Sequence, residues 1–282
     1  MQRKVKIVAD STCDLNAQML ERYGIEVIPL NVNLGDKSYL DGVNIHTPDL
    51  FEYYNKTGRL PTTSAPTPAY YEDFYQRWTN DGFEVVHFSI SSELTVTPNI
   101  AKMAAEKFDN IYPVDSRNVS SGMGILAVKA AELRDRGFSA KEIEEQVKGM
   151  TNKVRTTCVI STLLYMYKGG RCTGLQALGA NLLNLKPCID VKDGKMGVAK
   201  KYRGSLKSAV CKLVEDRLKG ADNIDLSRLI IANYDVDRDT IEAVKEKIKE
   251  FQNFDEIVVG NCGCSVSVHC GPGTFALMYM VQ

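Results

Sequence analysis

The chain has 282 residues, which is long enough to bury a sizeable core and to form two domains. Its 35 basic and 35 acidic residues give a formal net charge of zero, so we expect no nucleic-acid partner, because such binding needs a basic excess that displaces counterions. The hydrophobic content of 44% is ordinary for a globular protein, and without a run of about 18 apolar residues we expect no stable membrane insertion.

The N-terminus and the cysteines both favour a cytoplasmic protein. Residues 1–7 carry basic side chains but lead directly into a strand-like run, without the apolar stretch and cleavage site of a signal peptide. The eight cysteines are scattered along the chain, at positions 13, 158, 172, 188, 211, 262, 264 and 270. In a long chain without an export signal, we interpret them as reduced thiols.

The first half of the sequence alternates apolar runs with helical patterns. We predict strands at residues 6–10, 26–32, 85–90 and 111–115. Helices follow the first, third and fourth of these runs, with Gly24 ending the first helix, Thr97 capping the second and the third near residues 123–136. This alternation predicts a parallel sheet covered on both faces, with ligands bound beyond the carboxyl ends of its strands.

A polar excursion and a mixed second half complete the predicted elements. Residues 34–81 leave the sheet and contain two helices, at residues 48–56 and after Thr67, and a capping box at Ser139 starts a further helix. Beyond Val154 the predicted strands are residues 157–163, 228–234, 256–259 and 274–281, and the predicted helices are residues 175–185, 205–220 and 239–251. A hairpin signal at residues 192–195 favours a mixed or antiparallel sheet here.

We therefore predict an α/β protein of two domains. Residues 1–155 form the N-terminal α/β domain with a mostly parallel sheet, and residues 156–282 form a C-terminal α+β domain.

Three polar loops could converge on a small anionic group. Residues 62–68 and 91–98 each end in Thr-Pro, and hydroxyls with free N–H groups at a helix start suit a carboxylate or phosphate. In the third loop, residues 267–274 between two strand-like stretches, His269 precedes Gly271 and Gly273, which permit close backbone approach. Helix capping and a half-buried histidine in a turn explain the same residues without a ligand.

Two basic segments have both a structural and a binding interpretation. The turn that ends at Arg171 can be a helix C-cap, or its guanidinium can reach a carboxylate or phosphate. The patch of residues 200–207, which includes Arg203, is either a solvated edge or a docking surface for an acidic partner.

Motifs for catalysis or metal binding are scarce. Cys262, Cys264, His269 and Cys270 lie close together, with the Cys-x-Cys pair expected in a strand, but their spacing matches no usual structural zinc site, so we predict no metal. The signatures of α/β-hydrolases, zinc proteases and dinucleotide-binding proteins do not occur. An acyl hydrolase or transferase that uses a Ser or Thr with His269 stays open as an alternative.

Short runs over nearly the whole chain resemble, in the same order, those of the DegV family of bacterial fatty-acid-binding proteins. They are Asp10-Ser11-Thr12, Asp14-Leu15, Pro29-Leu30, Thr63-Ser64-Ala65-Pro66, Ser91-Ser92, Val114-Asp115-Ser116, Lys168-Gly169-Gly170-Arg171, Leu185-Lys186-Pro187, Arg203-Gly204 and His269-Cys270-Gly271-Pro272-Gly273-Thr274. The resemblance implies a long-chain fatty acid held between the two domains, an antiparallel sheet in the second domain and no other cofactor. It also implies a non-enzymatic role in phospholipid synthesis, in which a separate ATP-dependent fatty acid kinase converts the presented carboxylate to an acyl-phosphate.

The resemblance assigns roles to single residues. Thr63, Thr95 and His269 stand where the family binds the carboxylate. Four other positions are expected to line the pocket: Ser64, Ser92, Arg171 and Gly271. Arg203 is expected to dock the kinase.

The second polar loop departs from the family pattern. Thr95 replaces a serine and keeps the hydroxyl on a stiffer side chain, while Glu93 and Val96 replace two glycines and Pro98 follows. An acidic Glu93 beside a carboxylate disfavours binding unless its side chain points away.

Overall fold

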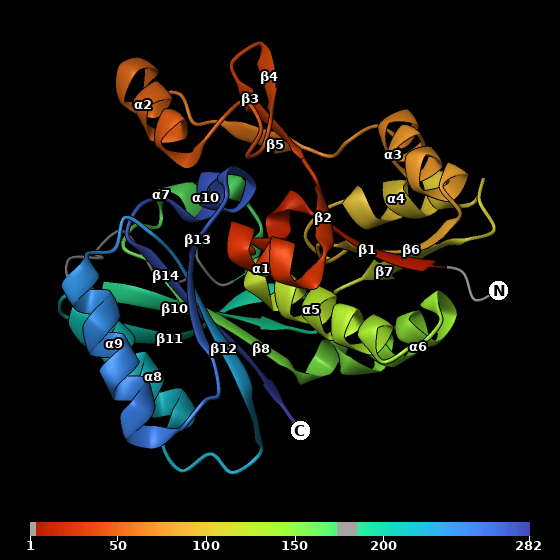
Figure 1. Ribbon diagram of the computed structural model, residues 1–282. Coiled ribbons are helices and arrows are strands. Elements are labelled where there is room, and N and C mark those ends of the chain that lie inside the picture. Colours follow the sequence, from red (N-terminus) through yellow and green to blue (C-terminus); the bar gives the residue numbers. More distant parts are fainter. Residues whose placement is uncertain (1–3, 174–184) are drawn as a thin grey trace.

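The computed structural model describes residues 4–173 and 185–282. Within these ranges it has three sheets, of four, seven and three strands, with helices packed on and between them (Figure 1). Helix α5 (Ser121–Asp135) lies between the two larger sheets and is buried nearly all round, as expected of a helix without a polar face. No helix in the described ranges is long and apolar enough to cross a bilayer. The predicted α/β fold class is confirmed.

The four-stranded sheet is the predicted parallel sheet. Its strands, in the order β2-β1-β6-β7, are β2 (Ile25–Ile28), β1 (Lys4–Asp10), β6 (Phe83–Ser89) and β7 (Ile111–Asp115). The helices around it are α1 (Ala17–Tyr23), α3 (Pro68–Asn80), α4 (Thr97–Ala105), α5 and α6 (Ala140–Met150). Gly24 ends α1 in the left-handed conformation, and Ser139 forms the predicted capping box of α6.

Both faces of this sheet are apolar because successive side chains of a strand point to opposite sides. In β1, Val8 packs in the cluster with α3 and α4, whereas Ile7 and Ala9 pack in the cluster with α5 and α6. The carboxyl ends of the strands meet at one edge, so Asp10 and Asp115 end two strands at the edge where ligands of parallel sheets bind.

The predicted strand at residues 26–32 is two strands in two sheets. β2 ends at Ile28, and β3 (Asn31–Leu34) starts a small antiparallel sheet in the order β4-β3-β5. Pro29 lies between them and has no N–H to continue the ladder. The two short partners, β4 (Lys37–Leu40) and β5 (Thr62–Ser64), were not predicted, and the predicted helix at residues 48–56 is α2 (Thr47–Thr57).

The seven-stranded sheet is mixed and mostly antiparallel, in the order β13-β12-β14-β8-β10-β11-β9. Its strands are β8 (Val154–Val159), β9 (Cys172–Thr173), β10 (Leu185–Lys192), β11 (Lys195–Arg203), β12 (Ile224–Tyr234), β13 (Ile257–Asn261) and β14 (Thr274–Val281). The predicted hairpin joins β10 to β11, with Asp193 and Gly194 at positive φ as its turn requires.

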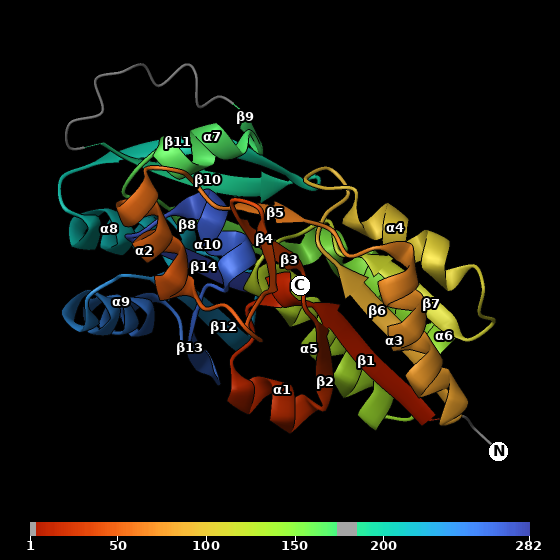
Figure 2. The same cartoon turned by 90° about the horizontal axis from the view of Figure 1, so that it is seen from above.

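Two amphipathic helices cover the outer face of this sheet. α8 (Leu206–Leu218) and α9 (Arg238–Phe251) pack on each other and lie at the end of the molecule opposite α3 and α4 (Figure 2). The predicted helix at 175–185 lies outside the described residues except for Leu185, which begins β10. The domain division at 155/156 stays a prediction, and β8 contains both residues.

Candidate functional site

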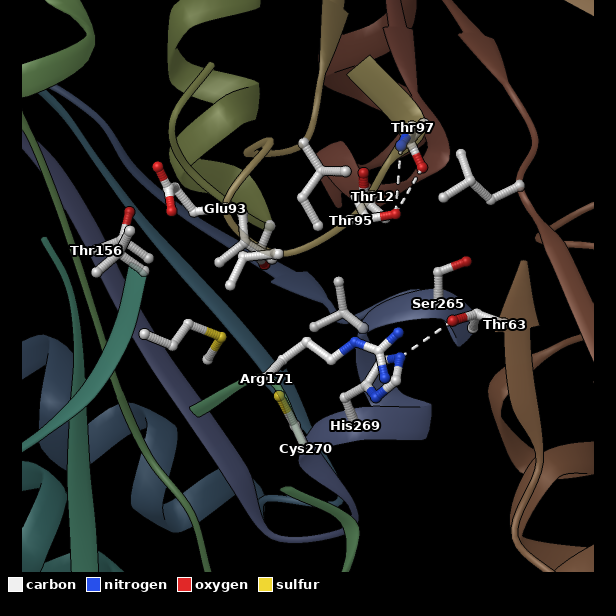
Figure 3. A pocket seen from close by; sticks show the side chains of 18 of the residues that line it. Thr12, Thr63, Glu93, Thr95, Thr97, Thr156, Arg171, Ser265, His269 and Cys270 are labelled. Carbon is white, nitrogen blue, oxygen red and sulfur yellow. Dashed lines mark hydrogen bonds between the residues drawn. The ribbon is translucent and has the colours of Figure 1, made fainter. Parts of the chain in front are cut away.

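A cavity of about 600 Å³ lies on the side of the seven-stranded sheet that faces α5 and the parallel sheet. This volume is typical of small-molecule sites, which measure roughly 300–1,000 Å³. Apolar side chains from both halves of the chain line much of it, among them Ile90, Val119, Ile189, Val191, Met196, Val266, Ala276 and Met278. Polar side chains line the rest, and Thr63, Ser265, His269 and Arg171 gather on one side (Figure 3). An apolar chamber with a few grouped donors suits an amphipathic ligand.

Two of the three predicted carboxylate-binding residues are in direct contact. Thr63 Oγ1 on β5 and His269 Nε2 lie 3.0 Å apart, a hydrogen-bond distance, although 206 positions separate the two residues (Figure 3). His269 does not lie in a loop, as the sequence suggested, but in the short helix α10 (Cys264–Cys270). The expectation that the Cys-x-Cys pair lies in a strand was wrong, because Cys262 follows β13 and Cys264 begins α10.

Carboxylates from distant parts of the chain hold α10 in place. Asp41 accepts hydrogen bonds from the N–H groups of Cys264 and Ser265, each at 3.0 Å, and Asp14 accepts one from Gly263 at 2.8 Å. Negative charge at a helix N-terminus is favourable and satisfies N–H groups that have no partner within the helix. The segment is helical because of these tertiary contacts, which no local sequence pattern indicates.

Asp14 is buried beside the cavity. Its burial raises the pKa of the carboxyl to about 7, against the opposing effect of the hydrogen bonds from the Ser120 hydroxyl, at 2.5 Å, and from Gly263.

His269 is a neutral side chain at neutral pH. Burial, together with the smaller effect of the positive charge of nearby Arg171, lowers the pKa of its imidazole to about 4. Its Nδ1 is buried and has no hydrogen-bond partner among the described residues. The ring therefore acts on its surroundings as a neutral donor or acceptor rather than as a cation.

Arg171 follows helix α7 (Leu164–Gly169) and lines the cavity. Gly170 ends α7 in the left-handed conformation, so the C-cap interpretation of this turn is correct. The Arg171 guanidinium also lies beside His269 (Figure 3), which brings a charged donor to the polar side. A side chain at Gly169 would place its Cβ 2.6 Å from His269 Nδ1, which explains why a glycine stands there.

Thr95 and Thr97 form a second pair of hydroxyls at the cavity. Their Oγ1 atoms are 2.9 Å apart, and the N–H of Thr97 points to Thr95 Oγ1 at 3.3 Å. The predicted N-cap role of Thr97 was wrong, because Thr97 is the first residue of α4 and Val96 is the N-cap. Thr95, the third predicted carboxylate-binding residue, thus lines the same cavity as Thr63 and His269 (Figure 3).

The remaining predicted pocket residues differ in their positions. Ser64 and Ser92 line the cavity, but the Ser92 hydroxyl already donates to Asp115 at 2.5 Å. Gly271 is not among the lining residues, and its lack of a side chain leaves room for the ring of Tyr165. Arg203 is exposed at the end of β11, and no described residue forms an ion pair with it.

Glu93 lies at the far side of the cavity from His269 (Figure 3), and two basic side chains offset its charge. Its carboxylate lies 3.7 Å from Arg117 and 3.4 Å from Lys195. The Ser91 hydroxyl also donates to the backbone oxygen of Gly194 at 2.8 Å, so this loop is tied to the β10–β11 hairpin. The acidic replacement therefore does not place an unpaired charge beside the polar group.

Three cysteines line the cavity as neutral thiols. They are Cys158, Cys262 and Cys270. Burial raises the pKa of all three thiols, that of Cys270 to about 12. They therefore pack as small apolar groups. Within residues 4–173 and 185–282, no three His, Cys, Asp or Glu side chains are arranged to hold a metal ion.

Sequence reasoning missed several polar lining residues, among them Thr12 and Ser265. Thr12 belongs to one of the runs that resemble the family, which was the available signal. Ser265 has no such signal, because its position depends on the fold of α10.

Comparison with known proteins gives one consistent result. The family model described as "Uncharacterised protein, DegV family" matches residues 4–282. A DegV domain-containing protein of Clostridium perfringens is 32% identical over 284 residues, which cover 99% of both chains.

Solved structures agree with the family match. A DegV family protein from Thermus thermophilus, described for its fatty acid binding, has a TM-score of 0.87 and 28% identity over 99% of this chain and 100% of its own. A stearic acid-binding protein from Eubacterium ventriosum has a TM-score of 0.83 and 25% identity, with 98% of each chain covered. A family model that spans nearly the whole sequence and relatives of the same length leave one conclusion: this chain belongs to the DegV family.

Proposed function

We propose that this protein binds a long-chain fatty acid, with the carboxylate at Thr63, Thr95 and His269 and the tail along the apolar lining. The observation that carries the proposal is the cavity itself, which joins a cluster of neutral donors to a chamber of aliphatic and methionine side chains. Its lining comes from both sides of position 155, which supports a ligand held between the two proposed domains. The fatty-acid-binding relatives from Thermus thermophilus and Eubacterium ventriosum add weight to this ligand class.

The tail contributes most of the binding free energy in this proposal. Burying one methylene contributes about 0.8 kcal/mol, so a tail of about 14 methylenes contributes roughly 11 kcal/mol before the costs of association. A hydrogen bond to a charged group contributes only about 1.5–3 kcal/mol. The apolar chamber therefore sets affinity, while the polar cluster sets which end of the ligand lies where.

The carboxylate needs its donors because burial without partners costs several kcal/mol. Neutral His269 and the threonine hydroxyls supply hydrogen bonds, and Arg171 supplies the compensating positive charge. Arg171 and Ser64 are both exposed while they line the cavity, so the polar end of the ligand lies near solvent. A second protein can reach a carboxylate in that position.

Presentation of this carboxylate to a separate ATP-dependent fatty acid kinase is the second part of the proposal. The kinase forms the acyl-phosphate, and this chain works in the cytoplasm as a carrier that supplies phospholipid synthesis. Exposed Arg203, without an ion pair among the described residues, is our candidate for the docking surface.

The enzyme alternative is disfavoured by the surroundings of His269. Its contact with the Thr63 hydroxyl resembles a nucleophile–base pair. A catalytic histidine needs a third group that orients its other nitrogen, but His269 Nδ1 has no partner among the described residues. An imidazole pKa of about 4 also makes a weak base at neutral pH.

Equilibrium binding of a saturated C16 fatty acid to delipidated protein tests the proposed function. We expect saturable binding of one fatty acid per chain, and no hydrolysis of a p-nitrophenyl acyl ester. Ester turnover that is abolished by His269→Ala would instead establish the enzyme.

A further inference from the structure

Three residues that line the cavity each carry a buried polar atom without a hydrogen-bond partner among the described residues. The atoms are Thr12 Oγ1, Ser265 Oγ and His269 Nδ1. Buried polar groups in proteins almost always have a partner, because an unpaired one is costly. His269 Nδ1 lies against Gly169, so the two hydroxyls, on residues that line one cavity, are the atoms that point to a ligand with hydrogen-bond acceptors.

Ser265 is placed next to His269 by the geometry of α10. The two residues are four positions apart in the helix, so their side chains lie on the same face, and both line the cavity (Figure 3). Ser265 is only 5% exposed. Ser267 on the same helix differs, because it does not line the cavity and its hydroxyl donates to the backbone oxygen of Cys262 at 3.3 Å.

Thr12 is held near Ser265 by a shared carboxylate. Asp41 Oδ2 accepts hydrogen bonds from the Ser11 hydroxyl at 2.9 Å and from the N–H of Ser265 at 3.0 Å. Thr12 follows Ser11 directly and is 2% exposed. Asp41 thus fixes both segments that carry the unpaired hydroxyls.

We propose that Ser265, together with Thr12, donates hydrogen bonds to the carboxylate of the bound fatty acid. The inference rests on the proposed function and extends its donor set beyond Thr63, Thr95 and His269. Neutral hydroxyls suit this role because they satisfy a buried anion without a second buried charge. The free protein carries the cost of the unpaired hydroxyls, and the ligand removes it.

The test compares Ser265→Ala with Ser267→Ala in delipidated protein. Titration with a C16 fatty acid should show about tenfold weaker binding for Ser265→Ala, the effect of one lost hydrogen bond to a charged group, and unchanged binding for Ser267→Ala. A C16 alcohol lacks the anion, so its affinity should change by no more than about twofold in either variant.

The two variants should rank in opposite orders for thermal stability and for affinity. Without ligand, Ser265→Ala should melt no lower than wild type, because it loses only an unpaired hydroxyl, whereas Ser267→Ala should melt lower. A residue with a merely structural role would lower the melting temperature and leave affinity for the acid unchanged.

A second pair of variants, at Thr12, tests the same inference without altering α10. Thr12→Val keeps the shape of the side chain and should weaken acid binding, and Thr12→Ser should retain it. If wild type binds the acid and both Ser265→Ala and Thr12→Val bind it equally well, this inference is overturned while the proposed function stands. If wild type itself binds no fatty acid, the proposed function fails, and this inference fails with it.

Discussion

The fully buried histidine of the α/β core and the half-buried histidine at the cavity have opposite surroundings. His87 on β6 is fully buried, and both of its ring nitrogens have partners, the Tyr75 hydroxyl at 2.7 Å and Asp10 at 3.0 Å. Among the described residues, His269 has one hydrogen-bond partner, Thr63, and its second nitrogen has none. A histidine whose hydrogen bonds are complete within the fold serves stability, whereas one left incomplete beside a chamber is available to a ligand.

The largest effect is expected from breaking the network of His87. His87→Ala leaves a cavity and removes a partner of buried Asp10, which also accepts a hydrogen bond from Tyr71. We expect a loss of about 3–5 kcal/mol in the free energy of unfolding, measured by urea denaturation. Fatty acid affinity of the folded fraction should stay as in wild type, and a selective loss of binding would contradict the division of roles.

Removal of two cavity hydroxyls should have the reverse effect, a loss of fatty acid affinity without a loss of folding. Thr63→Val together with Thr95→Val keeps the size of both side chains and removes two expected donors to the carboxylate. We expect binding of a C16 fatty acid to weaken by about 10- to 100-fold, with a cooperative unfolding transition preserved. Unchanged occupancy in the folded double variant would refute the assignment of the polar end.

The response to pH should distinguish His269 from a residue of ordinary pKa. Its pKa is about 4 in the folded chain and about 6.5 when unfolded, so between these values only the unfolded chain binds the proton. The stability that His269 contributes is therefore complete above about pH 6.5 and is lost as the pH falls towards 4.

Urea denaturation of wild type and His269→Asn measures this contribution directly. The difference in unfolding free energy between the two proteins should move in favour of the variant between about pH 7 and pH 5. Asp14, whose raised pKa acts in the opposite direction, is present in both proteins and cancels in the difference. A difference that does not change with pH would show that His269 titrates normally.

The smallest effect on the lipid is expected at Arg203. Arg203→Ala removes an exposed side chain that has no ion pair among the described residues, so lipid occupancy and stability should match wild type. Acyl-phosphate formation by a purified fatty acid kinase with ATP should nevertheless slow, by about tenfold if the charge contacts the kinase. Arg238→Ala, on the exposed start of α9, is the matched control, and equal rates for both variants would exclude Arg203 from docking.

The parallel sheet could be predicted from sequence because its strands are apolar on both faces. A short run such as residues 85–90, which is apolar on both faces, is typical of a strand in a buried parallel sheet. Gly24 and Ser139 indicate helix ends because glycine suits a C-cap and serine suits an N-cap. β4 and β5 escaped notice because they are short and polar, and their pairing with β3 depends on tertiary structure.

The site was less predictable than the sheet. The residues themselves suggested that three polar loops converge on an anion, but the choice of Thr63, Thr95 and His269 came from the family resemblance, since no spacing rule connects residues 206 positions apart. α10 is a helix because Asp41 and Asp14 satisfy its first N–H groups from more than 200 positions away. The role of Ser265 follows from that helix and so could not be read before the fold was known.

Mass spectrometry of an organic-solvent extract from natively purified protein is the most direct test of whether this cavity holds a fatty acid. We expect close to one free fatty acid per chain, lost from the Thr63→Val, Thr95→Val double variant and retained by the folded fraction of His87→Ala. An extract without fatty acid, followed by failure of the delipidated protein to take up added C16 acid, would contradict the assignment of this cavity to a fatty acid.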